Sequence, residues 1–358
     1  MKNNSMLRTV EARYMMILML LIVFAFKSSA TMGQTLYVDG LKGKNNAKGT
    51  VNDPLLSLDE AVLKTNSFKG NEPVTIKLNP GLYTVTHKLI LKTAGSAAGK
   101  EPYTIEAVTL PDDKAWQPTS MPVILCISGN NADYEFAHCE GMSVFQNNIN
   151  IRGLKFVGNP NTSVHYYYPI GRHDKTLSGL NVTQCLFIGE ANSSAIQSAF
   201  WVAGRGIHVD HCIFHNSKIA FVLSGNINGF SLTHSIIDGA YNTAIWYGFD
   251  GTQPKFTFKN NIVTNCYYVM VYPVENGQPA YTFSDSYITN NKNYLGNYPK
   301  AQDRFFAEPN KHIKEINIKK TGTIKLVDVK DDGITRDNLN PTKNSAGQST
   351  GAGLFLNK

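Results

Sequence analysis

Beyond residue 33 the chain lacks any long apolar run and any extended stretch of helical periodicity. The first absence leaves nothing to hold the mature chain in a bilayer, so we expect no membrane insertion. The absence of helical periodicity indicates that the chain consists mainly of short strands, because no helix of useful length fits between the turn signals. Charged residues make up only 17% of the chain.

Residues 1–33 have the order of a secretory signal peptide. Basic residues precede an apolar run at 15–26 that is too short to span a bilayer, and small residues follow it. We expect cleavage after Ala30 or Gly33, and therefore a secreted or periplasmic protein. No cysteine directly follows the apolar run, which disfavours a lipoprotein anchor. Cleavage lowers the formal net charge from +7 to about +4, a mild excess that demands no acidic partner such as a nucleic acid.

Six ten-residue segments in the middle of the chain share the pattern apolar-x-apolar-x-x-small-x-apolar. They begin at Ile149, Leu180, Ile207, Phe230, Phe256 and Tyr281. Consecutive starts are 23 to 31 residues apart, which is typical of a solenoid whose coils bury their apolar faces against their neighbours. We therefore predict an all-β fold, a right-handed parallel β-helix forming one elongated body.

The repeats divide the mature chain into three parts. We expect residues 34–110 to form an N-terminal cap and the first coils, residues 111–295 the β-helix repeats, and residues 296–358 a C-terminal cap. Ser57 followed by Glu60 marks the start of a short amphipathic helix. This helix would plug the open end of the solenoid. Residues 111–142 break the pattern and are interpreted as an irregular early coil with a surface loop.

The five cysteines are an odd number for an exported protein. Cys185 and Cys212 occupy the same position of the repeat, so we interpret them as packed thiols on coils about 4.8 Å apart. Cys126 and Cys139 are the pair whose spacing suits a local disulfide.

Two segments near the N-terminus carry a resemblance to a known family. Residues 54–61 read PLLSLDEA and residues 76–83 read IKLNPGLY. With the repeats, they make residues 35–295 resemble secreted pectate-lyase-like right-handed β-helix proteins, particularly those of gut and soil Bacteroidetes. The resemblance implies the fold, whereas the same scaffold carries lyases, hydrolases, epimerases and non-catalytic proteins.

An apolar stripe is expected on the outside of the coils. The seventh position of the repeat should face outward, yet it is occupied by Lys155, Leu186, Ile213, Ile236, Ile262 and Tyr287. Such a stripe cannot be left in water without creating a large exposed patch. Either the C-terminal segment covers it, or another chain does, or the assigned strand parity is wrong.

The third strand of each coil provides the candidate groove. We assign inward positions to Ile196, Phe221, Ile245 and Met270, and outward positions to Gln197, Val222, Trp246 and Val271. In the family resembled, this face and the loop after it bind the polysaccharide, which implies substrate contacts for Gln197, Trp246 and Asp250. Trp246 would stack on a sugar ring, and the alternative is that it packs beneath a loop.

The loops after this strand contain the candidate catalytic residues, which are Arg172, His173, Asp174, Lys175 and Arg205. They come from consecutive coils and are therefore expected to face one groove. A polysaccharide lyase removes the proton next to a uronate carboxylate, with a base that is often Arg or Lys in the family resembled and a cation that neutralises the carboxylate. The alternative is that these charged side chains are only solvated.

Paired carboxylates are missing from the repeats. The Asp-Asp pairs at 112–113 and 331–332 lie outside them, which disfavours hydrolysis by paired carboxylates. Because the aspartates of the repeats are scattered, calcium is not supported and we expect no cofactor. His208 and Asp210 share a strand face and His211 stacks beneath His234 at the bend, so a metal site is geometrically possible. The preferred interpretation is a structural polar ladder that Gln184, Asn260 and Asp285 continue, and no metal site is predicted.

Together these features predict an exported, monomeric carbohydrate-active protein that acts on an extracellular acidic polysaccharide by β-elimination. The alternative is a non-catalytic glycan-binding or surface-structural β-helix protein, and a glycosidase or epimerase is a further one.

Overall fold

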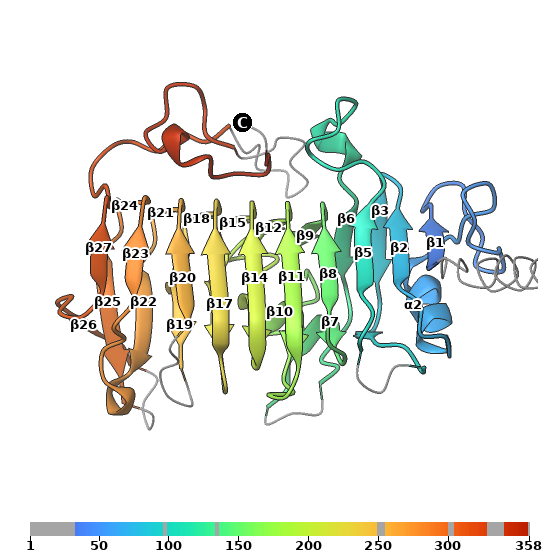
Figure 1. Cartoon of the computed structure of the whole chain (residues 1–358), viewed down its shortest axis with the longest axis horizontal. Helices are drawn as coiled ribbons and strands as arrows, with labels where there is room; N and C mark the ends of the chain where they lie inside the picture. Colours follow the sequence, from blue (N-terminus) through green and yellow to red (C-terminus); the bar gives the residue numbers. More distant parts are fainter. Residues whose placement is uncertain are drawn as a thin grey trace, which may run out of the picture.

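The chain folds into the predicted parallel β-helix (Figure 1). The computed structural model describes residues 33–95, 99–132, 136–248, 255–299, 304–327 and 340–356. Residues 1–32 of the predicted signal peptide, and Asp250, lie outside the described residues. Among those that are described, three long sheets have parallel pairing throughout, except for the antiparallel pair of β25 (Asn293–Tyr298) and β26 (Phe306–Glu308).

Most coils contribute one strand to each sheet. The ten-stranded sheet contains β1 (Gln34–Val38), β2 (Val74–Leu78), β5 (Tyr103–Ala107), β8 (Ile149–Arg152), β11 (Ser178–Thr183), β14 (Arg205–Asp210), β17 (Asn228–Thr233), β20 (Phe256–Lys259), β23 (Thr282–Ser284) and β27 (Lys314–Ile316). The eight-stranded sheet contains β3 (Leu82–Val85), β6 (Val123–Cys126), β9 (Lys155–Val157), β12 (Leu186–Ile188), β15 (Ile213–His215), β18 (Ile236–Asp238), β21 (Ile262–Thr264) and β24 (Tyr287–Thr289). The nine-stranded sheet contains β4 (Leu89–Leu91), β7 (Cys139–Val144), β10 (Tyr167–Arg172), β13 (Ser198–Val202), β16 (Ile219–Leu223), β19 (Thr243–Tyr247), β22 (Tyr268–Pro273), β25 and β26.

A left-handed residue makes the corner between the first two strands of each repeat. The fifth position of the repeat has φ between 44° and 68°, and is occupied by Gly153, Gln184, His211, His234, Asn260 and Asp285. Glycine, Asn, Asp and His are favoured in this region of backbone space, whereas branched residues clash there. The corner geometry therefore explains why this position of the repeat is never apolar.

Stacked side chains fill the interior of the solenoid. The rings of Phe156, Phe187 and Phe214 form a continuous stack, with centroids 4.8 and 4.9 Å apart and planes within 6° of parallel. This spacing is the distance between coils, so each repeat places its ring directly on the ring of the previous one.

The cysteines are also interior side chains. Cys185 and Cys212 are fully buried free thiols, which confirms the prediction for this pair. Cys126 and Cys139 are free as well, with their Sγ atoms 3.6 Å apart.

The predicted capping helix is α2 (Leu58–Asn66), which lies at the N-terminal end of the solenoid (Figure 1). Ser57 is its N-cap, and the Ser57 hydroxyl accepts a hydrogen bond from the Glu60 amide. On its buried face, the Thr65 hydroxyl lies 2.7 Å from the hydroxyl of Tyr103. No helix among the described residues is long and apolar enough to cross a membrane.

The C-terminal tail (residues 340–356) covers the apolar stripe, as predicted. Figure 1 shows this segment running back along the ends of the strands. Leu354 and Ala352 of the tail are buried in one apolar cluster with Leu186, Ile213, Ile236 and Ile262. The Gln184 side chain donates a 2.8 Å hydrogen bond to the Leu354 carbonyl. The tail also reaches the irregular early coil, where the Leu356 amide donates to the carboxylate of Asp112.

Candidate functional site

The candidate site lies on the outer face of the nine-stranded sheet, where the inward–outward alternation of β7 is interrupted. β7 keeps a constant register with β10 on both sides of Gly141, but Cys139 and Met142, three residues apart, both belong to the core. Glu140 and Ser143 both face outward and contact one another. This break in alternation brings two polar side chains, three residues apart in sequence, onto the same face.

The carboxylate of Glu140 is the centre of this site, although its side chain is only 3% exposed. His138 Nε2 lies 3.4 Å from Glu140 Oε1, and His173 Nε2 contacts the same oxygen. The Ser143 hydroxyl donates to the other oxygen, Oε2. Burial alone would raise the pKa of Glu140, but its contacts with His138, His173 and Ser143 outweigh the effect of burial and hold the pKa well below its usual range. Glu140 is therefore a buried anion between two imidazole rings.

Gly171 of β10 makes room for this carboxylate. A Cβ added to Gly171 would lie 2.8 Å from the carboxyl carbon of Glu140. Because the carboxylate is hydrogen-bonded on both oxygens, it cannot easily move aside. The position next to Glu140 therefore requires glycine.

An aromatic wall borders the Glu140 cluster. The Trp201 ring of β13 lies 4.7 Å from the His173 ring and 5.2 Å from the His138 ring. Phe136 stacks on Trp201 at 5.6 Å and meets the Tyr166 ring at 5.3 Å. Phe136 and Tyr166 are 40% and 39% exposed. They therefore present an aromatic surface suited to the apolar face of a sugar ring.

Two exposed cationic side chains lie at the corner that follows β10 and β13. Lys175 is in the loop after β10, and Arg205 is the first residue of β14 on the next coil. The Arg205 amide donates to the carbonyl of Leu177 at the end of that loop. Lys175, Arg205 and the outward His173 thus come from neighbouring positions at one end of the sheet.

The prediction that Arg172 lines the groove is wrong. Strand alternation turns Arg172 into the solenoid, where it is 1% exposed. Its Nε donates to the carbonyl of Ala203 at 2.8 Å, and its Nη2 donates to the carbonyl of Arg205 at 3.0 Å. Burial lowers the pKa of Arg172 to about 10. Arg172 therefore ties two coils together and does not reach the outer face.

Asp174 closes a turn in the loop after β10. Its Oδ1 accepts hydrogen bonds from the amide and the hydroxyl of Thr176, at 2.8 and 2.6 Å. These bonds lower the pKa of Asp174. The side chain shapes the loop that presents Lys175.

Gln197 does not lie where the predicted groove required it. The turn from Glu190 to Ser194 lengthens this coil, so β13 begins after Gln197, and Trp201 takes the place beside Val222. Gln197 precedes β13, whereas Arg205 follows it, and the five residues to the end of the strand span about 16 Å. Arg205 is therefore remote from Gln197, contrary to the prediction that placed them together.

Trp246 faces outward as predicted, in the column of Val222 and Val271. Its ring meets Tyr298 edge-on at 5.2 Å and Phe305 at 5.0 Å. The alternative of packing against neighbouring segments therefore describes Trp246 better than an open stacking platform.

His211 and His234 stack in the predicted polar ladder, at the corners after β14 and β17, and Asp210 contacts both rings. Asp210 accepts hydrogen bonds from Nδ1 of His211 at 2.8 Å and Nδ1 of His234 at 3.0 Å. The Thr233 hydroxyl also donates to Asp210. Burial opposes ionisation of Asp210, but these hydrogen bonds outweigh it and hold its pKa well below the usual range.

Replacing Asp210 with Asn is expected to lower the free energy of unfolding by about 2 kcal/mol at neutral pH, because charge-assisted hydrogen bonds are lost. The depressed pKa means that the native state holds the carboxylate as an anion after the unfolded chain has taken up a proton. The wild-type advantage should therefore be complete above about pH 4 and shrink as the pH falls further. Urea denaturation at a series of pH values measures this, and a gap that widens on acidification would contradict it.

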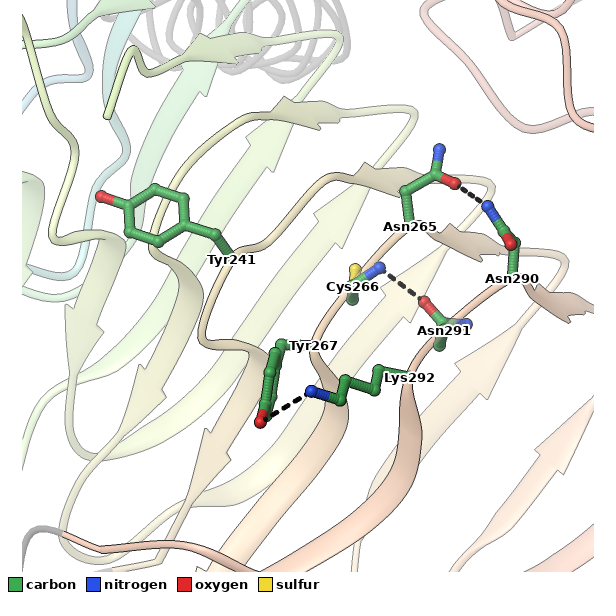
Figure 2. Close-up of a pocket in the computed structure, with 7 residues that line it drawn as sticks. All are labelled: Tyr241, Asn265, Cys266, Tyr267, Asn290, Asn291 and Lys292. Carbon is green, nitrogen blue, oxygen red and sulfur yellow. Dashed lines mark hydrogen bonds between the residues drawn. The ribbon is translucent and has the colours of Figure 1, made fainter. Parts of the chain in front are cut away.

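A second feature, a shallow groove of about 570 Å³, lies at the corners before β19, β22 and β25. Tyr241, Tyr267 and Lys292 line it, together with two asparagines that are hydrogen-bonded to each other (Figure 2). The Lys292 ammonium lies 3.2 Å from the Tyr267 hydroxyl and 4.3 Å from the ring centroid. Lys292 therefore covers part of the Tyr267 ring, while Figure 2 shows Tyr241 standing apart from both.

Similarity to known proteins is distant. No protein-family model matches the chain, and no curated protein matches it in sequence. A solved rhamnogalacturonan lyase is 14% identical with a TM-score of 0.42, covering 90% of this chain and 100% of that chain. A pectin methylesterase variant in complex with a hexasaccharide is 11% identical (TM-score 0.41), and pectin methylesterase PemA from Erwinia chrysanthemi is 10% identical (TM-score 0.35). Each of these two covers 84% of this chain and 92% of that chain. Likeness at this level does not define the chemistry of the site.

Sequence reasoning missed the residues around Glu140. His138, Glu140 and Phe136 fall in or beside the segment without a recognisable repeat, and Trp201 and Tyr166 were not on the predicted strand face. The available signal is the His-x-Glu spacing at 138 and 140, because alternate residues of an extended chain share a side.

Proposed function

We propose that this protein is exported and, as a monomer, cleaves an extracellular acidic polysaccharide by β-elimination on the outer face of the nine-stranded sheet. The observation that carries the proposal is one juxtaposition on the outer face of β7, β10 and β13. The exposed rings of Phe136 and Tyr166 lie where β7 and β10 begin, the Glu140 cluster joins His138 before β7 to His173 after β10, and the cations Lys175 and Arg205 lie where β10 and β13 end. Aromatic rings suit the faces of sugars, and fixed cations suit uronate carboxylates.

The reaction requires a base beside a neutralised carboxylate. The base removes the proton from the carbon that bears the carboxylate, the glycosidic carbon–oxygen bond at the next carbon breaks, and a double bond forms between the two carbons. The departing oxygen takes up a proton. Arg205 or Lys175 serves as the base, and the other contacts the carboxylate.

A second candidate is glycan binding without catalysis at the corner groove. Tyr241 and Tyr267 come from adjacent coils and are 40% and 42% exposed, with Lys292 beside them. Such a row of rings could hold a sugar chain, but it contains no pair of groups placed to move a proton.

Two matched substitutions distinguish the candidates. Tyr166→Ala is expected to weaken binding of a uronate polymer about 5- to 10-fold, because it removes a stacking ring worth about 1 kcal/mol. Tyr241→Ala removes a ring of equal exposure from the corner groove and is expected to leave affinity unchanged. Affinity electrophoresis or calorimetry on polymers of different uronates measures both variants. The reverse pattern would move the binding site to the corner groove.

A further inference from the structure

Two clusters among the described residues bring together three side chains that can hold a metal ion. One contains His138, Glu140 and His173, and the other contains Asp210, His211 and His234; within each, the ligand atoms lie within 4.8 Å of one another. In the second cluster, the Asn260 amide donates to Nε2 of His234, and Nδ1 of His234 donates to Asp210. That histidine is therefore satisfied as a neutral ring without any ion.

The first cluster is different because of the partner of His138. His138 Nδ1 lies 2.8 Å from the carbonyl oxygen of Phe136. A carbonyl only accepts, so Nδ1 carries the hydrogen, and Nε2 of the neutral ring has a lone pair. That lone pair points at Glu140 Oε1, 3.4 Å away. Two acceptors facing each other at a buried position repel unless a cation or an additional proton lies between them.

The surroundings of the cluster have the features of a metal site. Ligating histidines commonly donate their second ring nitrogen to a backbone carbonyl, as His138 does to Phe136, and ligating carboxylates are themselves hydrogen-bonded, as Glu140 is by Ser143. Tetrahedral ligands bound at about 2.1 Å lie about 3.4 Å apart. The separation of His138 Nε2 and Glu140 Oε1 is 3.4 Å.

One side of the cluster is accessible. The His138 and Glu140 side chains are 0% and 3% exposed, whereas His173 is 25% exposed. Solvent and ions therefore reach the cluster at His173. The aromatic wall around Trp201 shields the other side.

We infer that His138, Glu140 and His173 bind a divalent transition metal, Zn²⁺ by preference, with a fourth coordination position open toward the aromatic surface. Two imidazole nitrogens and one carboxylate oxygen form a ligand set that suits Zn²⁺ and not Ca²⁺, which takes six to eight oxygens. The three ligands leave a net charge of about +1 on the site, so the open position suits an anionic ligand.

In the setting of the proposed function, on which this role rests, that anionic ligand is the uronate carboxylate of the substrate. The metal would neutralise the carboxylate while Arg205 or Lys175 removes the adjacent proton. Binding of the metal itself does not depend on this role.

The test is metal binding by the purified full-length chain, without a polyhistidine tag and after treatment with a chelator. Calorimetry with Zn²⁺ is expected to show one site per chain, and Co²⁺ should give the visible absorption bands of a four- or five-coordinate ion. His173→Gln, at the more exposed position, is expected to weaken Zn²⁺ binding about 100-fold or more, since even loss of an outer partner of a ligand costs 10- to 100-fold. His138→Gln should do the same if the buried substitution folds.

The matched control is His234→Gln in the polar ladder, which should leave Zn²⁺ affinity unchanged. Absence of Zn²⁺ binding in the wild-type protein, or binding that survives His173→Gln, would overturn the inference. If His234→Gln alone lost Zn²⁺ binding, the metal would be held by the cluster of Asp210, His211 and His234, and the inference would be overturned as well. If the protein binds Zn²⁺ but turns over no uronate polymer, the metal site is supported and the proposed function is refuted. If it turns over a uronate polymer but does not bind Zn²⁺, the proposed function is supported and the metal site is refuted.

Discussion

Deletion of residues 340–358 is expected to turn a soluble protein into one that aggregates and melts at a markedly lower temperature. The tail buries Leu354 completely against an outer stripe that includes Leu186, Ile213 and Ile236. Without the tail, these side chains would form a contiguous apolar patch on the outside of four coils. Light scattering and thermal melting measure the two effects.

A single substitution isolates the same contact. Leu354→Ala is expected to lower the free energy of unfolding by about 2–5 kcal/mol, as for other fully buried leucines. Leu356→Ala, two residues further along at a side chain that is 46% exposed, should change it by about 0.5 kcal/mol or less. A truncated chain that stays soluble with an unchanged melting temperature would show that the tail does not protect the stripe.

Arg205→Ala is expected to abolish turnover of a uronate polymer while leaving the melting temperature unchanged. The Arg205 side chain is exposed at the corner, so it contributes little to packing. Loss of a catalytic base typically costs about 10²- to 10⁴-fold in rate. Lys292→Ala is the matched control, because it removes a cation from the corner groove at the other end of the strands and should leave turnover intact. Full activity in Arg205→Ala, with activity lost in Lys175→Ala, would give the base to Lys175.

The fold could be predicted from the sequence because each coil repeats the same physical requirements. Inward positions had to be apolar, and the left-handed corner at positions such as Gln184 and Asn260 excluded branched residues. Burial of the outer stripe could be predicted too, because five apolar side chains on an outward face would form a large exposed patch unless another segment covered them. The capping helix followed from Ser57 and Glu60.

The site could be predicted only in part, because it lies where the repeat is irregular. The break in inward–outward alternation at Gly141 places Glu140 and Ser143 on one face, and a strict period of two does not predict it. The long turn before β13 shifted the outward position from Gln197 to Trp201. Arg172 was assigned to the loop after the third strand, whereas in the structure it is the last residue of β10 and turns inward to bind backbone carbonyls.

The central claim is β-elimination of an acidic polysaccharide, and the most direct test is the ultraviolet absorbance of the unsaturated uronate product. The wild-type chain would be incubated with pectin, alginate, heparinoids and chondroitin, with Arg205→Ala in parallel. Absorbance is expected to rise steadily with one class of polymer for the wild-type protein and not for the variant. If the folded protein binds one of these polymers but absorbance rises with none of them, β-elimination is contradicted and glycan binding remains as the function.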